Sequence, residues 1–278
     1  MPAKSPVPPQ EPMPPAAAVP AQNPPSPPNA RSVVRDGARP VAQERCRGLA
    51  GTWGTLAVLT EVTLKAVPKA EETRTLVLFG QPDEIAIEIL CGAMATPYEV
   101  TGAIHLQASL ARRLRNQTLR DEGLAVTALR IENFSASIAY RAGRLKELFS
   151  AYGEIVELDH PASIAFWEEL RALSYLQGSR DPVWRISTSP KMGPRVVQAI
   201  SGYMQTKAAY DWSGGLLWLE VPASADAGSA DIRRVIAMRG GHATLIRADD
   251  EARRTVEVFQ PLEAGPERLT RRLKQAFD

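Results

Sequence analysis

The sequence predicts an α+β fold with an antiparallel sheet, and two observations carry that prediction. After Pro68, short segments rich in branched apolar residues alternate with amphipathic segments of helical period. The resulting order, β-α-β-β-α-β, occurs twice in succession. Two ferredoxin-like split β-α-β units satisfy this order, and so does one antiparallel sheet built from both copies with helices on one face. The hydrophobic content of 44% is enough for a packed core.

The first copy extends from Thr73 to Leu158. Pro82 suits the first turn of a helix because it has no amide hydrogen to leave unpaired, and Asp83 and Glu84 favour the positive end of the helix dipole. Ser135 is expected to cap the second helix. In order, the expected elements are a strand at 73–79, a helix at 82–95, strands at 100–106 and 124–131, a helix at 136–152 and a strand at 155–158.

The second copy follows a connecting helix that Ser163 is expected to cap. Its centre is a hairpin around Ser213-Gly214-Gly215, where glycines permit the tight turn. The expected elements are a strand at 184–188, a helix at 194–204, strands at 208–212 and 216–221, a helix at 231–239 and a strand at 243–247.

The amino-terminal segment has a different composition. Residues 1–40 contain 13 of the 23 prolines and almost no aromatic or branched apolar residues. Such a segment cannot bury enough surface to offset its ordering entropy, so residues 1–45 are expected to form a disordered, partly polyproline II tail. A linker is one interpretation. A proline-rich ligand for a partner is another, because Pro6-x-x-Pro9 and Pro12-x-x-Pro15 have the required spacing.

Charge and cysteine content exclude several functions. A net charge of +2 and a pI near 8.6 do not indicate nucleic-acid binding. Cys46, Cys91 and three dispersed histidines cannot supply a zinc or iron-sulfur site from this chain alone, so no metal is expected. The low cysteine content is typical of the cytoplasm, and no apolar stretch has the length of a membrane span.

A glycine-containing turn precedes the first β-branched run. Glycines tolerate positive φ and let a backbone approach a ligand closely, so this turn is a candidate nucleotide-contact loop. The alternative is an ordinary turn that leads into a buried strand starting at Ala57. The candidate cofactor-binding residues are Gly51, Thr52, Gly54, Ala57, Val58 and Thr60.

His242 and Arg185 are the candidate catalytic residues. His242 follows two glycines and could accept a substrate proton, or it could simply begin a strand. Arg185 could bind a carboxylate through its guanidinium, with Trp184 as a flat wall, or it could form a cross-strand salt bridge with Glu220. Trp212 and Trp218 are expected to fill the core or a subunit contact, with flavin stacking as the alternative.

Several segments carry a resemblance to a known family. LAGTWGTLAVLTEVTLKAVP, residues 49–68, resembles the end of the FAD-binding domain in flavin oxidases related to vanillyl-alcohol oxidase. Thr52 stands there in place of the usual Ser, and Ala57 in place of the usual last Gly. Residues 183–187 (VWRIS), 212–218 (WSGGLLW) and 240–244 (GGHAT) resemble, in the same order, segments of the FAD-binding subunits of glycolate oxidases.

The resemblance implies a function and a domain organisation. It implies FAD as cofactor, oxidation of a small 2-hydroxy acid (glycolate to glyoxylate), and transfer of electrons to an iron-sulfur subunit in an oxidase complex. Residues 46–68 would be a remnant of the FAD-binding domain, and residues 69–278 the cap or substrate domain. The protein would be located in the cytoplasm, or at a membrane through its partners.

The same resemblance leaves alternatives open. Most of the family's FAD-binding domain has no counterpart before residue 46, and the family's carboxy-terminal tail has none after Asp278. We therefore expect a truncated or misframed family member that retains FAD poorly by itself. A noncatalytic interaction subunit, bound to another flavin-bearing chain, is the alternative function. A relative that acts on lactate or an alditol is a third.

Overall fold

The computed structural model describes residues 34–36, 39–41, 49, 51–58, 61 and 68–277. The chain divides into two compact units, Pro68–Leu269 and a smaller one made of Met1–Val67 and Thr270–Asp278. In the smaller unit, strands β1 (Val34–Asp36) and β2 (Arg39–Val41) form an antiparallel pair. This pair falls within the predicted tail, and the rest of the predicted tail lies outside the described residues.

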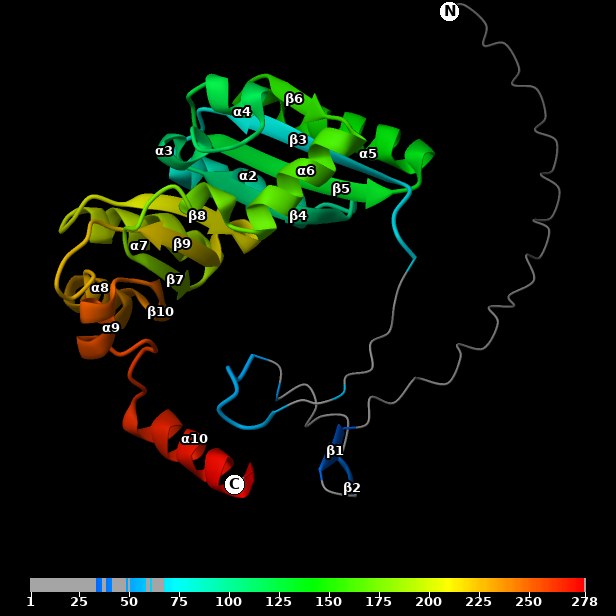
Figure 1. Ribbon diagram of the computed structural model, residues 1–278. Helices are drawn as coiled ribbons and strands as arrows, with labels where there is room; N and C mark the ends of the chain where they lie inside the picture. The colour runs from blue at the N-terminus through cyan, green and yellow to red at the C-terminus, as the bar shows by residue number, and fades with distance from the viewer. Residues whose placement is uncertain are drawn as a thin grey trace, which may run out of the picture. The chain divides into compact units, whose positions relative to one another are not determined.

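The larger unit is built on one eight-stranded sheet in the order β10-β7-β9-β8-β4-β5-β3-β6, and every neighbouring pair is antiparallel (Figure 1). This confirms the predicted antiparallel sheet. The strands are β3 (Glu72–Phe79), β4 (Val100–Leu106), β5 (Val126–Asn133), β6 (Ile155–Leu158), β7 (Val183–Ser187), β8 (Lys207–Asp211), β9 (Leu216–Glu220) and β10 (His242–Arg247).

Each half of the sheet repeats one arrangement. Strands β3 to β6 form one half of the sheet, and β7 to β10 form the other. From the outer edge of each half to the centre of the sheet, the fourth strand of that half comes first, followed by its first, third and second strands. The halves meet through their second strands, β4 and β8. The main helices of the first half are α2 (Asp83–Met94) and α5 (Ser135–Phe149), and those of the second are α7 (Gly193–Ser201) and α8 (Ser229–Arg239).

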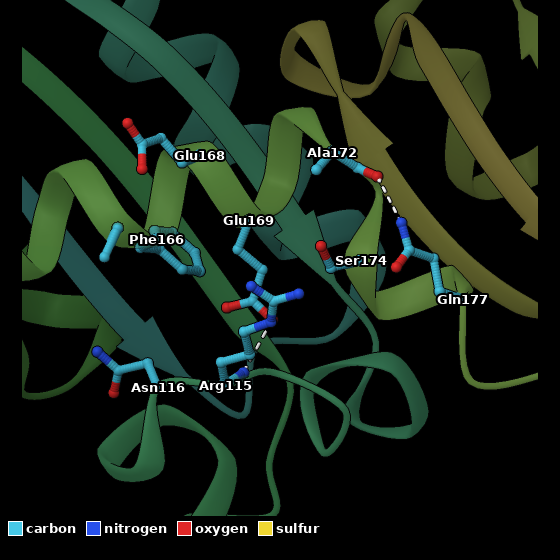
Figure 2. Close-up of a pocket in the computed structure, with 9 residues that line it drawn as sticks. Arg115, Asn116, Phe166, Glu168, Glu169, Ala172, Ser174 and Gln177 are labelled. Carbon is cyan, nitrogen blue, oxygen red and sulfur yellow. Dashed lines mark hydrogen bonds between the residues drawn. The ribbon is translucent and has the colours of Figure 1, made fainter.

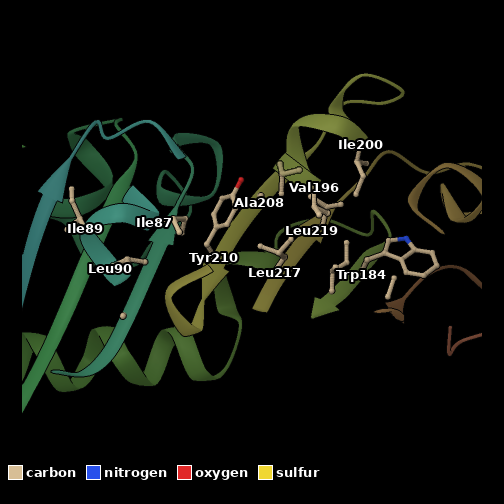
Figure 3. Close-up of a cluster of buried hydrophobic side chains, with 14 of the residues drawn as sticks. Ile87, Ile89, Leu90, Trp184, Val196, Ile200, Ala208, Tyr210, Leu217 and Leu219 are labelled. Atoms are coloured by element: carbon tan, nitrogen blue, oxygen red, sulfur yellow. The ribbon is translucent and has the colours of Figure 1, made fainter. Parts of the chain in front are cut away.

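These four helices cover one face of the sheet and share one apolar core across both halves. Figure 3 shows side chains of α2 near Tyr210 at one end of the cluster and Trp184 at the other. Both aromatic residues are fully buried. Burial of a large apolar side chain stabilises a fold by about 1.5–3 kcal/mol, so this shared cluster opposes separation of the halves.

The opposite face is covered mainly by the connecting helix α6 (His160–Arg171). Phe166 and Leu170 of α6 pack with Val77, Ile104 and Tyr175 in a second core. Three short elements complete this layer: α3 (Ala108–Ala111), α4 (Gln117–Asp121) and the turn of 3-10 helix η2 (Ser174–Leu176). The prediction of helices on one face only is therefore wrong, because α6 needs a surface on which to bury its own apolar side.

Both predicted serine caps are wrong. Ser135 is already the first residue of α5, and Phe134 occupies the cap position. Helix α6 begins before Ser163, because the Asp159 carboxylate caps it by accepting a hydrogen bond from the Ala162 amide (3.0 Å) and a proline suits its first turn. Ser163 is instead buried, and its hydroxyl donates to a backbone carbonyl.

Other boundaries shift by up to three residues, and four described helices, α3, α4, α9 (Asp250–Thr255) and α10 (Ala264–Phe277), were not predicted. The strand predicted at 124–131 is β5, at Val126–Asn133. Helices α9 and α10 complete the described carboxy-terminal segment.

His160 is structural, because its Nδ1 accepts a hydrogen bond from the Thr73 amide (2.8 Å).

The backbone joint between the two halves is short. Strands β4 and β8 pair only at His105 with Tyr210 and at Leu106 with Ala209. The Gln107 side chain extends the joint, because its Oε1 accepts a hydrogen bond from the Ala208 amide (2.8 Å).

The Asp83 carboxylate binds side chains on both sides of this joint. It accepts hydrogen bonds from the Tyr210 hydroxyl (2.5 Å) and the Gln107 amide nitrogen (2.8 Å), and it lies 3.2 Å from His105 Nε2. Burial raises the pKa of Asp83, but the hydrogen bonds from His105 and Tyr210 outweigh it, so the pKa lies below its ordinary value. The first residue of α2 therefore connects β4 to β8.

We expect Asp83→Asn to destabilise the sheet unit by about 1–3 kcal/mol, because the buried donors lose a charged acceptor. The free energy of unfolding from urea denaturation, followed by circular dichroism, measures this. A carboxyl with a lowered folded pKa stabilises the fold above its unfolded pKa, ordinarily 3.8, and loses that contribution as the pH falls through the folded value. The wild-type advantage should therefore shrink in acid.

The matched control is Asp121→Asn, because Asp121 is 56% exposed and pairs only with a neighbouring arginine at the surface. Its unfolding midpoint should equal that of the wild type. Equal stability of the two variants at neutral pH would contradict the role of Asp83.

Candidate functional site

Arg185 lies on the α6 side of the sheet, in the second half. Along β7 the side chains alternate, so Trp184 and Ile186 point into the four-helix core and Arg185 points to the opposite face. The register places Arg185 between Thr244 of β10 and Trp218 of β9. A rigid central strand therefore holds the base of this side chain.

The guanidinium of Arg185 is available for a ligand. Its central carbon lies 5.8 Å from the centre of the Trp212 ring, within range of a cation–π contact. Within the described part of the chain, Arg185 has neither a hydrogen bond nor an ion pair with a carboxylate. A half-buried guanidinium of this kind can bind a carboxylate through two parallel hydrogen bonds.

Glu220, the expected alternative partner of Arg185, is engaged elsewhere. It lies opposite Val183, two residues farther along the strand pair. Arg113 binds both its oxygens at 2.8 Å, and Lys207 approaches to 2.6 Å. Burial raises the pKa of Glu220, but these hydrogen bonds bring it below the ordinary value. The predicted salt bridge between Arg185 and Glu220 is therefore wrong, and Glu220 has a structural role.

His242 is the first residue of β10 and is exposed. It lies opposite Ser187, so the register puts its side chain on the same face as Arg185, in the diagonal position. The two glycines before it have structural roles, one in backbone conformation and one in packing. Gly240 ends α8 with φ +84°, and a side chain on Gly241 would collide with the Ser187 carbonyl oxygen.

The tryptophans differ from expectation. Trp184 is completely buried and donates a hydrogen bond to the Ala227 carbonyl (2.8 Å), so it cannot line a ligand site. Trp212 is 62% exposed, so the prediction that it fills the core is wrong. It begins the short helix η4 (Trp212–Gly214) with φ +50°, a left-handed conformation that turns the ring outward. Trp218 is half-buried against the second core.

The glycine turn of the smaller unit is open. Gly51 and Gly54 have φ of +84° and +74°, and a side chain on either would meet no other atom within 4 Å. Thr52 closes the turn by donating from its hydroxyl to the Leu49 carbonyl (3.0 Å). The glycines are thus needed for backbone conformation, and the space beside them is open.

The strand expected after this turn does not begin at Ala57. Ala57 and Val58 have no regular secondary structure, and Val58 is 86% exposed. Thr60 and most of the rest of that segment lie outside the described residues. The cofactor-contact role of the turn stays a prediction.

A hollow of about 570 Å³ lies between α6 and the loop before α4. Figure 2 shows Glu169 projecting from α6 toward Arg115, whose amide donates to it (2.8 Å). This bond fastens the loop to the helix, and Glu169 is only 5% exposed. Glu169 is therefore already used to hold the loop, and the face around Arg185 is the better candidate for a substrate site.

The described residues contain neither a cluster of metal ligands nor a membrane-spanning helix. No three histidine, cysteine or acidic side chains there come together as metal ligands. None of the helices described is both long and apolar enough to cross a bilayer.

Sequence reasoning missed the contact between Trp212 and Arg185. The available signal was Ser213-Gly214-Gly215, since small residues after an aromatic one permit the left-handed turn that exposes it. Gly214 has φ +96°, and a side chain there would lie 2.8 Å from the Pro190 carbonyl oxygen.

No protein-family model matches the sequence, and no curated protein matches it significantly. Solved structures do. A structure of alkyldihydroxyacetonephosphate synthase has a TM-score of 0.52 at 11% identity, over 82% of this chain and 47% of that one. A structure of p-cresol methylhydroxylase with substrate bound has a TM-score of 0.54 at 11% identity, over 83% and 55%.

The chain shares the fold of the matched parts of these two structures. It spans about half the length of these two structures. At this level of identity the likeness establishes the fold, and the activity must be argued from the side chains.

We expect Glu220→Gln to lower the free energy of unfolding by about 3 kcal/mol, because it leaves partly buried cations without their carboxylate. Arg185→Gln should stay within about 0.5 kcal/mol of the wild type, because no partner of Arg185 is lost. Parallel urea denaturation of both variants measures the difference. A loss on Arg185→Gln as large as that on Glu220→Gln would show that Arg185 has a structural role.

Proposed function

We propose that this chain is the substrate-covering part of an FAD-linked oxidoreductase, and that it acts on a small 2-hydroxy acid such as glycolate. The observation that carries the proposal is Arg185, a guanidinium that has no carboxylate partner within the described part of the chain. The shared oxidase fold and the motif resemblance support the redox class. We also infer that the two halves are ferredoxin-like units, and their strand orders support this.

The residues divide the chemistry between them. Arg185 would bind the substrate carboxylate and fix the orientation of the neighbouring carbinol carbon. His242, diagonal to Arg185 on the same face, would accept the hydroxyl proton as the carbonyl forms. When bound, FAD supplies the acceptor for the hydride that leaves the same carbon. The product is the 2-oxo acid.

The smaller unit would contact the cofactor. The space beside Gly51 and Gly54 is open, as close backbone approach requires, and Thr52 holds the turn between them. Ala57, Val58 and Thr60 continue the same contact in the resemblance. Electrons would pass to an iron-sulfur subunit of a complex, in the cytoplasm or at a membrane surface.

In the complex purified with its natural subunits, we expect flavin absorbance and turnover of glycolate with an artificial electron acceptor. Arg185→Gln should lower kcat/KM by about 100-fold, because a charged hydrogen-bonded contact to the carboxylate is lost. His242→Ala should lower kcat by at least about 100-fold. Arg112→Gln, at an exposed arginine, is the matched control and should leave both parameters unchanged.

Unchanged turnover in both site variants would contradict the catalytic proposal and favour a noncatalytic interaction subunit. Turnover of lactate or an alditol in preference to glycolate would contradict the substrate assignment alone. Stoichiometric flavin on the separate chain would contradict the expectation that it retains FAD poorly.

A further inference from the structure

A pocket of about 690 Å³ opens on the α6 side of the sheet, where the two halves separate. It is lined by β4, by α2 and α6 from the two faces of the sheet, and by the turn after β8. Arg185 is not among the residues that line it, so binding in this pocket is independent of the proposed function. The residues that carry the argument are Gly102, Trp167, Tyr175, Asp211 and Trp212.

The pocket exists because β4 loses its neighbour. Pairing with β8 ends at His105, and the chain after β8 turns away through Trp212 and Ser213, with φ of +50° and +56°. Backbone in this conformation costs about 1–3 kcal/mol per residue and persists only where its surroundings impose it. The earlier residues of β4 are therefore left beside a space instead of a strand.

Trp167 forms a rigid wall of this space. Its indole nitrogen donates to the Thr75 hydroxyl (2.9 Å), and the Arg130 guanidinium lies 4.8 Å from the ring centre. Gly102 allows the close approach, because a side chain there would lie 2.8 Å from the ring. A flat apolar molecule can pack on such a fixed aromatic surface with little loss of side-chain entropy.

Tyr175 brings an unpaired polar group to the pocket. The residue is 1% exposed, and its hydroxyl has no hydrogen-bond partner among the described residues. A buried hydroxyl left in this state costs about 1–3 kcal/mol, so a bound ligand that pairs with it gains that contact. Burial and the charge of Asp211 raise the pKa of Tyr175, which places the two groups within electrostatic reach of each other.

Asp211 supplies an acceptor. One of its oxygens accepts a hydrogen bond from the Trp212 amide (2.7 Å), which fixes the carboxylate at the end of β8. Burial raises the pKa of this carboxyl, because charge is poorly solvated there. A donor from a ligand would compensate for the lost solvation.

We propose that this pocket binds a flat, mainly apolar molecule with one hydroxyl group, which accepts a hydrogen bond from Tyr175 and donates one to Asp211. A hydroxyl performs both tasks without carrying charge. A carboxylate would be repelled by Asp211, and an ammonium would meet the guanidiniums of Arg130 and Arg171. Trp167 and the apolar side chains beside it would hold the flat part.

The test is calorimetric titration of the full chain with three probes that share one ring system: naphthalenemethanol, methylnaphthalene and naphthoate. We expect naphthalenemethanol to bind about 10-fold more tightly than methylnaphthalene, the value of one to two hydrogen bonds. Tyr175→Phe and Asp211→Asn should each remove most of that preference. Tyr140→Phe and Asp121→Asn, at exposed positions, are the matched controls and should preserve it.

A measurement of unfolding shows whether the Tyr175→Phe variant stays folded. Tyr175→Phe removes a buried unpaired hydroxyl, so its unfolding midpoint should equal or exceed that of the wild type. Loss of preference with a retained fold then supports the site.

Equal binding of the alcohol and the hydrocarbon, absence of binding, tighter binding of naphthoate, or an unchanged preference in Tyr175→Phe would each overturn the proposal. Arg185→Gln should keep the preference for the alcohol even where it abolishes glycolate turnover. The two proposals can therefore fail separately.

Discussion

The carboxylate of Asp83 is the interaction on which the rest of the sheet depends. The backbone contact between β4 and β8 covers only two register pairs, and so short a ladder is weak by itself. Asp83 adds hydrogen bonds from Gln107 and Tyr210, one on each side of the joint. Because an ionised acceptor makes stronger hydrogen bonds than a neutral one, α2 fixes the angle between the halves as well as their distance.

The two faces of this sheet have different physical roles. The four-helix face is covered by one continuous apolar core. The other face is covered only by α6 and short elements. Some of its polar residues form a structural charge cluster, and others lie apart from it. Glu220 binds Arg113, which lies in the loop after α3, and Lys207, the first residue of β8. Arg185 lies outside this charge cluster because these two cations already occupy Glu220.

Local patterns in the sequence predict the elements well and the partners poorly. The bounds of β4 and β6 were predicted correctly, because alternation of apolar side chains depends only on neighbours along the chain. The burial of Trp184 and the exposure of Trp212 could not be predicted from such local patterns. One is buried and the other exposed because of packing with distant residues and a left-handed turn. The caps failed for a similar reason, since Asp159 competes with Ser163 for the same helix end.

The three separated motifs that resemble glycolate oxidase subunits lie on adjacent strands: β7, β9 with its preceding turn, and β10. Most of their residues serve the fold. Trp184 fills the core, and Gly214 and Gly241 stand where a side chain would collide with backbone. The needs of the fold therefore explain much of the resemblance, without any shared activity. Shape does not explain why Arg185 lies beside exposed Trp212, with His242 in the diagonal position. These three side chains are the basis of the proposed function.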